Sequence, residues 1–167
     1  LNLFVFLCFH MRRRLIYVLN WSIDHPEMPK IELRFQDLSG LNFEYANLSN
    51  SDFRRANFDN AKLSNVDFTQ ANLSNADLSG LDLTGTVLTE ANLSGVILTG
   101  VDLSEIDLSG LELSAAKLIG VDLSEKDLTG TLLKEAKLSN ANLSGIDLSN
   151  TDLTLAKLTG SDLSNAN

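Results

Sequence analysis

The sequence has few of the residues on which catalytic and metal sites depend. Its 167 residues include two histidines, His10 and His25, and one cysteine, Cys8. A single cysteine excludes an intrachain disulfide and a metal cage built on thiolates. Residues 31–167 contain no histidine for a Ser-His-Asp arrangement, and the chain has no HExxH motif, phosphate-binding glycine loop or Cys/His metal spacing. The sequence therefore predicts no enzymatic activity, no cofactor and no metal.

Basic residues are scarce relative to acidic ones. The chain has 13 Lys and Arg against 22 Asp and Glu, which gives a net charge of −9. Nucleic-acid binding depends on Lys and Arg, so this charge argues against nucleic acid as a direct partner. It suits a soluble protein, or one that binds a basic surface.

No apolar run is long enough to span a membrane. The first nine residues are mostly apolar, but a spanning helix needs about 20 residues. Arg12, Arg13 and Arg14 follow this run, whereas a secretory signal carries its positive charges before it. We therefore predict no targeting signal and favour a cytoplasmic location, with export left open. Residues 1–30 are expected to form an N-terminal segment that is either a cap or partly disordered.

A period of five residues dominates the rest of the chain. In SGLDLTGTVLTEANLSGVILTG (79–100), leucine recurs at 83, 88, 93 and 98. From Leu33 to Leu163, all 27 such central positions hold Leu or Phe. The residue two before the centre is mostly small or apolar, and the residue directly before it is Asp, Asn, Glu or Lys in 24 of 27 repeats. Ser or Thr follows the centre in 21 repeats, and all ten glycines lie two residues after it.

This period matches neither an α-helix nor a strand, but it fits a coil that bends every five residues. Three residues alternate inward and outward like a short strand, and the next two favour a turn. Four bends close a square coil of 20 residues, and three close a coil of 15. A spacing of 20 aligns Gly40 only with Gly or Asn, whereas a spacing of 15 aligns it with Arg55, so 20 is preferred. We predict an all-β fold over 31–167, a parallel β-helix of nearly seven coils, roughly 32 Å long.

The repeats resemble those of the pentapeptide-repeat family. ANLSN (46–50), ADLSG (76–80), ANLSG (91–95 and 141–145) and SDLSN (161–165) look like the A(D/N)Lxx motif of that family. The resemblance implies a right-handed quadrilateral β-helix, and the family is abundant in cyanobacteria. Most members have no assigned function, while others resemble duplex DNA in shape and charge and act on DNA gyrase. Those relatives typically dimerise through a C-terminal segment and some carry inserted loops, whereas no insertion interrupts the register here.

Charged side chains before the centres predict candidate interaction surfaces. At a spacing of 20, two columns of aspartate form on two faces, and a column of lysine forms on a third. The columns are Asp82, Asp102 and Asp122; Asp107, Asp127 and Asp147; and Lys117, Lys137 and Lys157. The aspartates serve either solubility and turn formation or competition with DNA for a basic protein groove.

Apolar residues at outward positions are a second kind of candidate surface. Ile97 and Ile119 fall on the same side of adjacent coils, and Val87, Leu132 and Leu155 are also predicted to face outward. They are either scattered surface residues, which are common, or a small partner-binding patch.

One exception within the pattern and its two ends carry further expectations. Lys126 replaces a small inward residue, so it either extends outward or is buried and paired with Glu125 or Asp127. Phe35 and Tyr45 are expected to contact the N-terminal cap. The pattern stops at SDLSNAN, which leaves a coil edge uncovered and predicts an end-to-end homodimer or a truncated chain.

The function that the sequence favours is a non-catalytic structural or protein-interaction module, a rigid acidic rod whose protein partner is unknown. The alternative is a DNA mimic that binds DNA gyrase or another DNA-binding protein.

Overall fold

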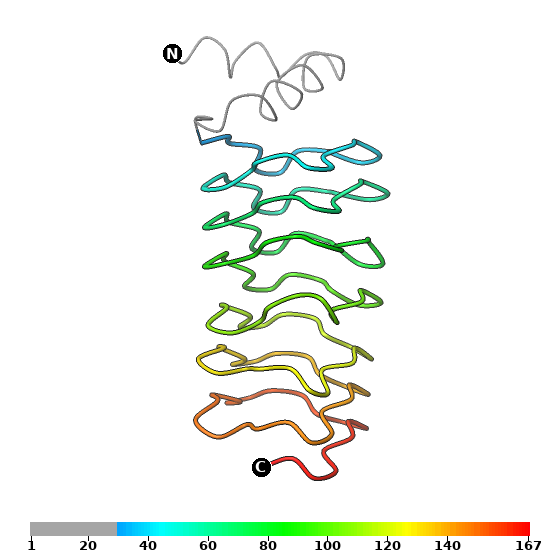
Figure 1. Cartoon of the computed structure of the whole chain (residues 1–167), viewed down its shortest axis with the longest axis vertical. Coiled ribbons are helices and arrows are strands. Elements are labelled where there is room, and N and C mark those ends of the chain that lie inside the picture. Colours follow the sequence, from blue (N-terminus) through cyan, green and yellow to red (C-terminus); the bar gives the residue numbers. More distant parts are fainter. Residues whose placement is uncertain (1–29) are drawn as a thin grey trace.

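The computed structural model describes residues 30–167, so nearly all of the predicted N-terminal segment lies outside the described residues. These residues wind into a stack of coils that runs along the long axis of the molecule (Figure 1). A two-residue turn occurs every five residues, from 34–35 to 164–165. Within 30–167 there is no helix and no continuous strand, because the coils pair through isolated parallel bridges, from Glu32↔Asp52 to Asn142↔Asp162.

The bridges define the length of one coil. All seventeen join residues that are 20 apart, which is the coil length that the sequence predicts. Four turns fall within each 20 residues, so each coil has four sides. We call the stacked sides faces 1 to 4. Their paired residues, here called rung residues, repeat every 20 positions from Glu32 (face 1), Asp37 (face 2), Asn42 (face 3) and Asn47 (face 4).

The turns have the geometry that the repeat predicts. In 25 of the 27 repeats the amide after the turn donates to the carbonyl of the central residue, as Ala46 does to Phe43 at 2.9 Å. The second turn residue has a positive φ of 55° to 75° in 26 of the 27 turns, and Glu105 is the exception. Gly and Asn tolerate this conformation best, which explains their place in the repeat.

In most repeats the residue before the centre supports the turn from outside. Its Asp or Asn carboxyl or amide oxygen accepts a hydrogen bond from the amide two residues later, as in Asp82 with Thr84 (2.9 Å) and Asn92 with Ser94 (3.0 Å). Short polar side chains form such turns readily. Asp and Asn at this position are therefore explained by local structure.

The central Leu and Phe residues fill the interior. Most are almost fully buried, and small residues such as Ala76 and Ala116 pack beside them where the wall is close. Four phenylalanines lie together near the N-terminal end, with ring centroids 5.6 to 6.4 Å apart and mostly edge-to-face: Phe43, Phe53, Phe58 and Phe68. Each buried Leu or Phe contributes about 1.5 to 3 kcal/mol by transfer from water.

Buried hydroxyl groups at small inward positions are hydrogen-bonded. Thr86 donates to the carbonyl of Leu63 at 2.9 Å, and Thr131 donates to that of Leu108 at 2.7 Å. Both acceptors lie 23 residues earlier, in the preceding coil. These hydroxyls therefore connect neighbouring coils through the interior without a desolvation penalty.

Candidate functional site

Charge is distributed unequally around the coil. Faces 3 and 4, each taken with the turn that follows it in the chain, carry 12 acidic and 2 basic residues, a net charge of −10. Faces 1 and 2 carry 8 acidic and 7 basic residues, a net charge of −1. We call faces 3 and 4 the acidic surface.

The two predicted aspartate columns lie on the acidic surface. Register places Asp82, Asp102 and Asp122 on face 3, and it places Asp107, Asp127 and Asp147 on face 4. All six aspartates are exposed, and Glu105 and Glu125 add two exposed carboxylates at the corner that the two faces share. Their role in binding stays a prediction.

Hydrogen bonds lower the pKa of these aspartates. The pKa of Asp127 lies below its ordinary value because the hydroxyl and the amide of Thr129 donate to its carboxylate. The amide and hydroxyl of Ser104 act in the same way on the pKa of Asp102. The columns are therefore fully ionised at neutral pH, despite the proximity of like charges.

The lysine column lies on face 2, where bridges join its members directly. Lys117 pairs with Lys137 and Lys137 with Lys157, while Ile97 pairs with Lys117. Lys117, Lys137 and Ile97 are half-buried, whereas Lys157 and Ile119 are exposed. Face 2 therefore presents mixed basic and apolar side chains.

The other apolar residues predicted to face outward are exposed, which confirms their orientation. Val87 is on face 4, Leu132 is on face 1, and Leu155 is at the corner between faces 1 and 2. Val87 lies on a different side of the coil from Leu132 and Leu155, so the three residues do not form one patch.

Lys126 extends out of the wall rather than into the core. It is half-buried, and its ammonium group donates to the carbonyl oxygens of Ser104 and Ile106 (3.1 Å to Ile106) in the preceding coil. No ion pair with Glu125 or Asp127 occurs among the described residues, so the predicted alternative of a buried, paired lysine is wrong. Its positive charge instead helps to lower the pKa of Asp102 and of Asp107.

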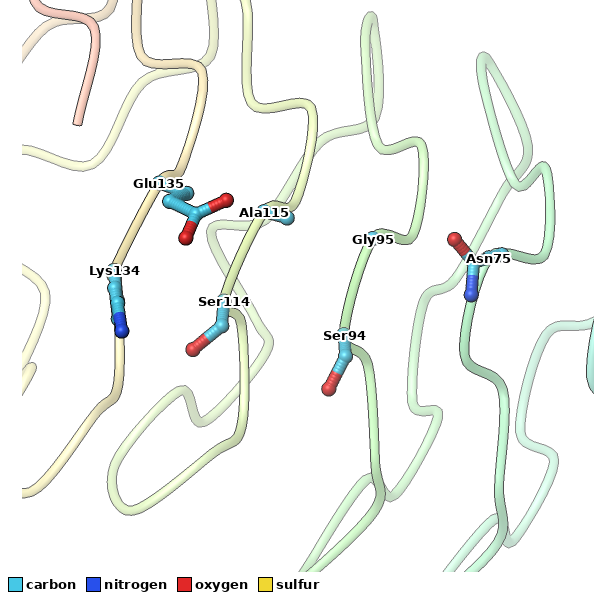
Figure 2. A pocket seen from close by; sticks show the side chains of 7 residues that line it. All are labelled: Asn75, Ser94, Gly95, Ser114, Ala115, Lys134 and Glu135. Carbon is cyan, nitrogen blue, oxygen red and sulfur yellow. The ribbon is translucent and has the colours of Figure 1, made fainter. Parts of the chain in front are cut away.

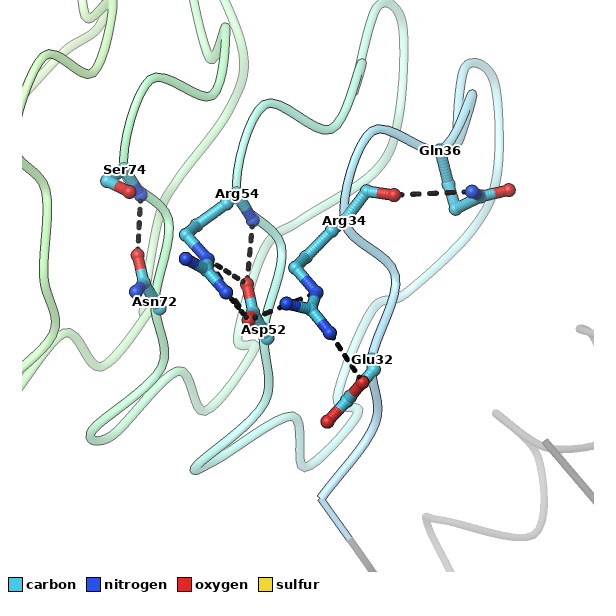
Figure 3. Close-up of polar contacts among 7 residues, drawn as sticks. All are labelled: Glu32, Arg34, Gln36, Asp52, Arg54, Asn72 and Ser74. Atoms are coloured by element: carbon cyan, nitrogen blue, oxygen red, sulfur yellow. Dashed lines mark hydrogen bonds and ion pairs between the residues drawn. The ribbon is translucent and has the colours of Figure 1, made fainter. Parts of the chain in front are cut away.

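An arginine cluster on face 1 was not anticipated from the sequence (Figure 3). Two guanidinium nitrogens of Arg54 donate to the carboxylate of the nearly buried Asp52, Nη2 to Oδ2 at 2.8 Å and Nε to Oδ1 at 3.0 Å. Arg34 reaches the same carboxylate at 3.5 Å and Glu32 at 2.8 Å. The Arg54 hydrogen bond lowers the pKa of Asp52. The sequence signal for this cluster is the pair Arg34 and Arg54, which are 20 residues apart and each follow a rung carboxylate by two residues.

A shallow hollow of about 250 Å³ lies at the corner between faces 1 and 2 (Figure 2). It forms because Gly95 and Ala115 have little or no side chain at two successive corner positions. Its lining residues are Asn75, Ser94, Gly95, Ser114, Ala115, Lys134 and Glu135. Lys134 and Glu135 close one end, and the hollow holds no arrangement of groups for acid–base or nucleophilic chemistry.

Two kinds of feature are absent from residues 30–167. These residues include no group of three or more acidic, histidine or cysteine side chains positioned to hold a metal ion. Nor does any helix in this part of the chain have the length and apolar character needed to cross a membrane.

Comparison with protein families gives one match. The family model described as pentapeptide repeats matches in eight copies, over residues 37–75, 71–110, 106–150 and 132–167. A comparison with curated protein sequences gives no significant match.

Solved structures of similar proteins come from several organisms. HetL from the cyanobacterium Nostoc sp. PCC 7120, a pentapeptide repeat protein involved in heterocyst differentiation regulation, is 26% identical, with a TM-score of 0.47, over 82% of this chain and 84% of HetL. The pentapeptide repeat protein alr5209 from Nostoc PCC 7120 is 35% identical, with a TM-score of 0.31, over 64% of this chain and 84% of alr5209. QnrB1, a plasmid-mediated fluoroquinolone resistance protein, is 22% identical, with a TM-score of 0.39, over 82% and 74%.

Proposed function

The chain belongs to the pentapeptide-repeat family, and from that premise we propose that its right-handed quadrilateral β-helix is a non-catalytic protein-interaction module. The acidic surface is its binding surface, and the partner presents a basic protein surface. The observation that carries this proposal is the unequal charge, −10 on faces 3 and 4 against −1 on faces 1 and 2.

The physical basis is electrostatic complementarity on a rigid frame. Exposed carboxylates repeat at the coil spacing of about 4.8 Å and are held in place by hydrogen bonds to their own turns. A basic partner therefore meets charges at fixed positions and loses little entropy in ordering them. Such surfaces mainly raise the association rate and the specificity, and their binding weakens as salt rises.

A cationic peptide tests the proposal without a known partner. Binding of a lysine decapeptide is measured by fluorescence anisotropy at low salt, for the wild type and for a variant with Asp102, Asp122, Asp107 and Asp127 changed to Asn. We expect this variant to bind about tenfold or more weakly, because four exposed charges of a few tenths of a kcal/mol each are lost.

The matched control removes four acidic charges from the other faces. Asp37, Asp77, Asp152 and Glu112 lie on faces 1 and 2, and their change to Asn or Gln should leave peptide binding nearly unchanged. Equal losses in the two variants would show that binding depends on total charge and not on the acidic surface, and would refute the proposal.

The alternative is a DNA mimic that binds DNA gyrase or another DNA-binding protein, and the density of the columns favours it. Segments 101–110 and 121–130 each carry three acidic residues on the acidic surface, or one acidic charge per about 1.6 Å at the coil spacing, with Lys126 as the one basic residue in the two segments. Duplex DNA carries one per about 1.7 Å. A supercoiling assay with purified gyrase tests this alternative. If micromolar protein neither protects nor inhibits gyrase, the alternative is eliminated.

A further inference from the structure

Pairing between coils is uneven around the molecule. On faces 1 and 2 all twelve rungs from Glu32 to Lys157 are bridged, but on faces 3 and 4 only five of twelve are. The unbridged rungs within the described residues are 62–82, 82–102 and 102–122 on face 3, and 87–107, 107–127, 127–147 and 147–167 on face 4.

The open rungs coincide with the aspartate columns. The described chain has four rungs in which aspartate stacks directly on aspartate, and none of them is bridged: 82–102, 102–122, 107–127 and 127–147. Of the other three unbridged rungs, Lys62–Asp82 and Val87–Asp107 adjoin these columns without a like-charged pair, and Asp147–Asn167 keeps its backbone hydrogen bonds. The missing bridges between coils therefore coincide with these side chains and are confined to the acidic surface.

Stacked lysines do not have this effect. Leu118 donates to the carbonyl of Lys137 at 2.9 Å, and Lys137 donates to that of Ala116 at 2.8 Å, so the Lys117–Lys137 rung is closed. A lysine ammonium lies at the end of a long flexible chain and can move away from its neighbour. An aspartate carboxylate cannot, because it is held against its own turn, as Asp107 is by the amide of Ser109 at 2.9 Å.

Rungs in which asparagine replaces one aspartate of the pair are closed. Asp122↔Asn142 and Asn142↔Asp162, on the same face 3, are bridged, as are four more Asp–Asn rungs: Asp37↔Asn57, Asn57↔Asp77, Asn47↔Asp67 and Asp52↔Asn72. The 147–167 rung lacks a bridge but keeps both backbone bonds, from Leu148 to Asn167 (2.9 Å) and from Asn167 to Ile146 (3.0 Å). Asparagine makes the same turn bond without the charge.

A cation already occupies one open rung. The carbonyl of Ile106, which binds the Lys126 ammonium, corresponds to the acceptor that the amide of Asp127 would use in a closed rung, as the amide of Asp52 uses the carbonyl of Ile31. Ser104, whose carbonyl also binds this ammonium, flanks Glu105, the one turn without a positive φ. Lys126 therefore places a positive charge where the backbone of two coils is apart.

We propose that faces 3 and 4 form an electrostatic seam, in which repulsion between stacked aspartates holds the rungs open and neutralisation of these charges closes them. The coupling to a partner rests on the proposed function: a basic protein that covers the columns would close the seam and stiffen the rod. Binding and coil pairing would then support each other, as linkage requires.

Amide hydrogen exchange followed by NMR tests the seam in the whole chain. The amides of Leu103 and Leu128, which face open rungs, are compared with those of Leu118 and Leu138, which donate to Lys137 and Lys157. In about 20 mM NaCl we expect Leu103 and Leu128 to exchange about tenfold or more faster. In about 500 mM NaCl, where repulsion is screened, this difference should shrink.

Single substitutions locate the cause. Asp102→Asn converts two Asp–Asp rungs into Asp–Asn rungs and should slow exchange at Leu103 about tenfold. Asp67→Asn makes the same chemical change on face 4 in rungs that are already bridged. It should not alter exchange at Phe68, whose amide already donates to the carbonyl of Val87 at 2.8 Å.

Two results would overturn the proposal. One is exchange at Leu103 in low salt that is as slow as at Leu118. The other is fast exchange that responds to neither salt nor Asp102→Asn, which would assign the gap to the bulk of inward residues such as Val101 and Val121. A lysine decapeptide is added last and should slow the same amides. If it fails to bind, the proposed function fails, while the salt and Asp102→Asn measurements still decide whether the seam exists.

Discussion

At the residue scale, the second turn position governs which side chains a repeat accepts. Its backbone is left-handed at Gly95 and Gly120 alike, with φ of +68° and +69°. The two glycines differ in their surroundings. A Cβ on Gly95 would lie 2.5 Å from Oδ1 of Asn75 in the preceding coil, whereas a Cβ on Gly120 would meet nothing within 4 Å. Strain and crowding can therefore be separated in this chain.

Alanine at these two positions should cost different amounts of stability. We expect Gly120→Ala to lower the free energy of unfolding by about 1 kcal/mol, the cost of a left-handed residue with a Cβ. Gly95→Ala should cost about 1 kcal/mol more, because the Asn75 side chain must also move. Urea unfolding followed by circular dichroism measures both. Asn75→Gly should bring Gly95→Ala back to the level of Gly120→Ala, and an unchanged difference would contradict the crowding.

The effect of Lys126 should depend on salt. Lys126→Ala removes two hydrogen bonds to carbonyl oxygens. It also removes the only basic residue between Asp102 and Asp127 on the acidic surface. In return, it frees the carbonyl oxygen of Ile106 for the Asp127 amide. We expect a loss of about 1 kcal/mol in unfolding free energy at low salt, which vanishes or reverses in about 1 M NaCl. A loss of equal size at both salt concentrations would mean that the lysine acts through packing alone.

At the scale of one coil, the aromatic cluster places the largest buried side chains in the coils near the N-terminal end of the described residues. Phe58 is fully buried and contacts Phe43, Phe53 and Phe68 through ring pairs 5.6 to 6.4 Å apart. We expect Phe58→Leu, which restores the commonest central residue, to cost about 1 kcal/mol in unfolding free energy, and Phe58→Ala to cost about 3 to 5 kcal/mol. Thermal and urea unfolding measure both.

The C-terminal end of the same interior offers the control. Leu158 is only partly buried, so Leu158→Ala should cost less than Phe58→Ala and less than Leu118→Ala at the fully buried equivalent position on face 2. Equal costs along the stack would show that burial at a given coil does not set its contribution, contrary to neighbour-limited stability.

How far the sequence leads is clearest at this scale. The 20-residue coil, the four turns and the outward position of Val87 follow from the repeat itself, because each is decided by which residue types alternate. The grip of Arg54 and Arg34 on Asp52 was not predicted, since it depends on side-chain conformations between two coils. Nor were the open rungs, because they depend on whether a charge can move away from its neighbour, which the composition of a column does not reveal.

At the scale of the whole molecule, the sum of many turn hydrogen bonds links stability to pH. Nine aspartates have a pKa below the ordinary 3.8 because turn hydroxyls and amides, or for Asp52 an arginine, bind the charged form. They are Asp52, Asp82, Asp102, Asp107, Asp122, Asp127, Asp147, Asp152 and Asp162. Near pH 4 the unfolded chain binds more protons than the folded one, so stability rises with pH there.

The urea midpoint should therefore be flat from about pH 7 to pH 5 and fall as the pH drops below about 4, through the folded pKa values. A variant with Asp82, Asp102 and Asp122 changed to Asn keeps the turn bonds without titrating, so its midpoint should fall less. The pH dependence of the urea midpoint also compares the two effects that act on the aspartate columns. Hydrogen bonds favour the charged aspartates, and repulsion across the seam disfavours them. A midpoint that rises on acidification would mean that repulsion outweighs the turn bonds, contradicting the lowered pKa values, whereas a fall means that the turn bonds outweigh the repulsion.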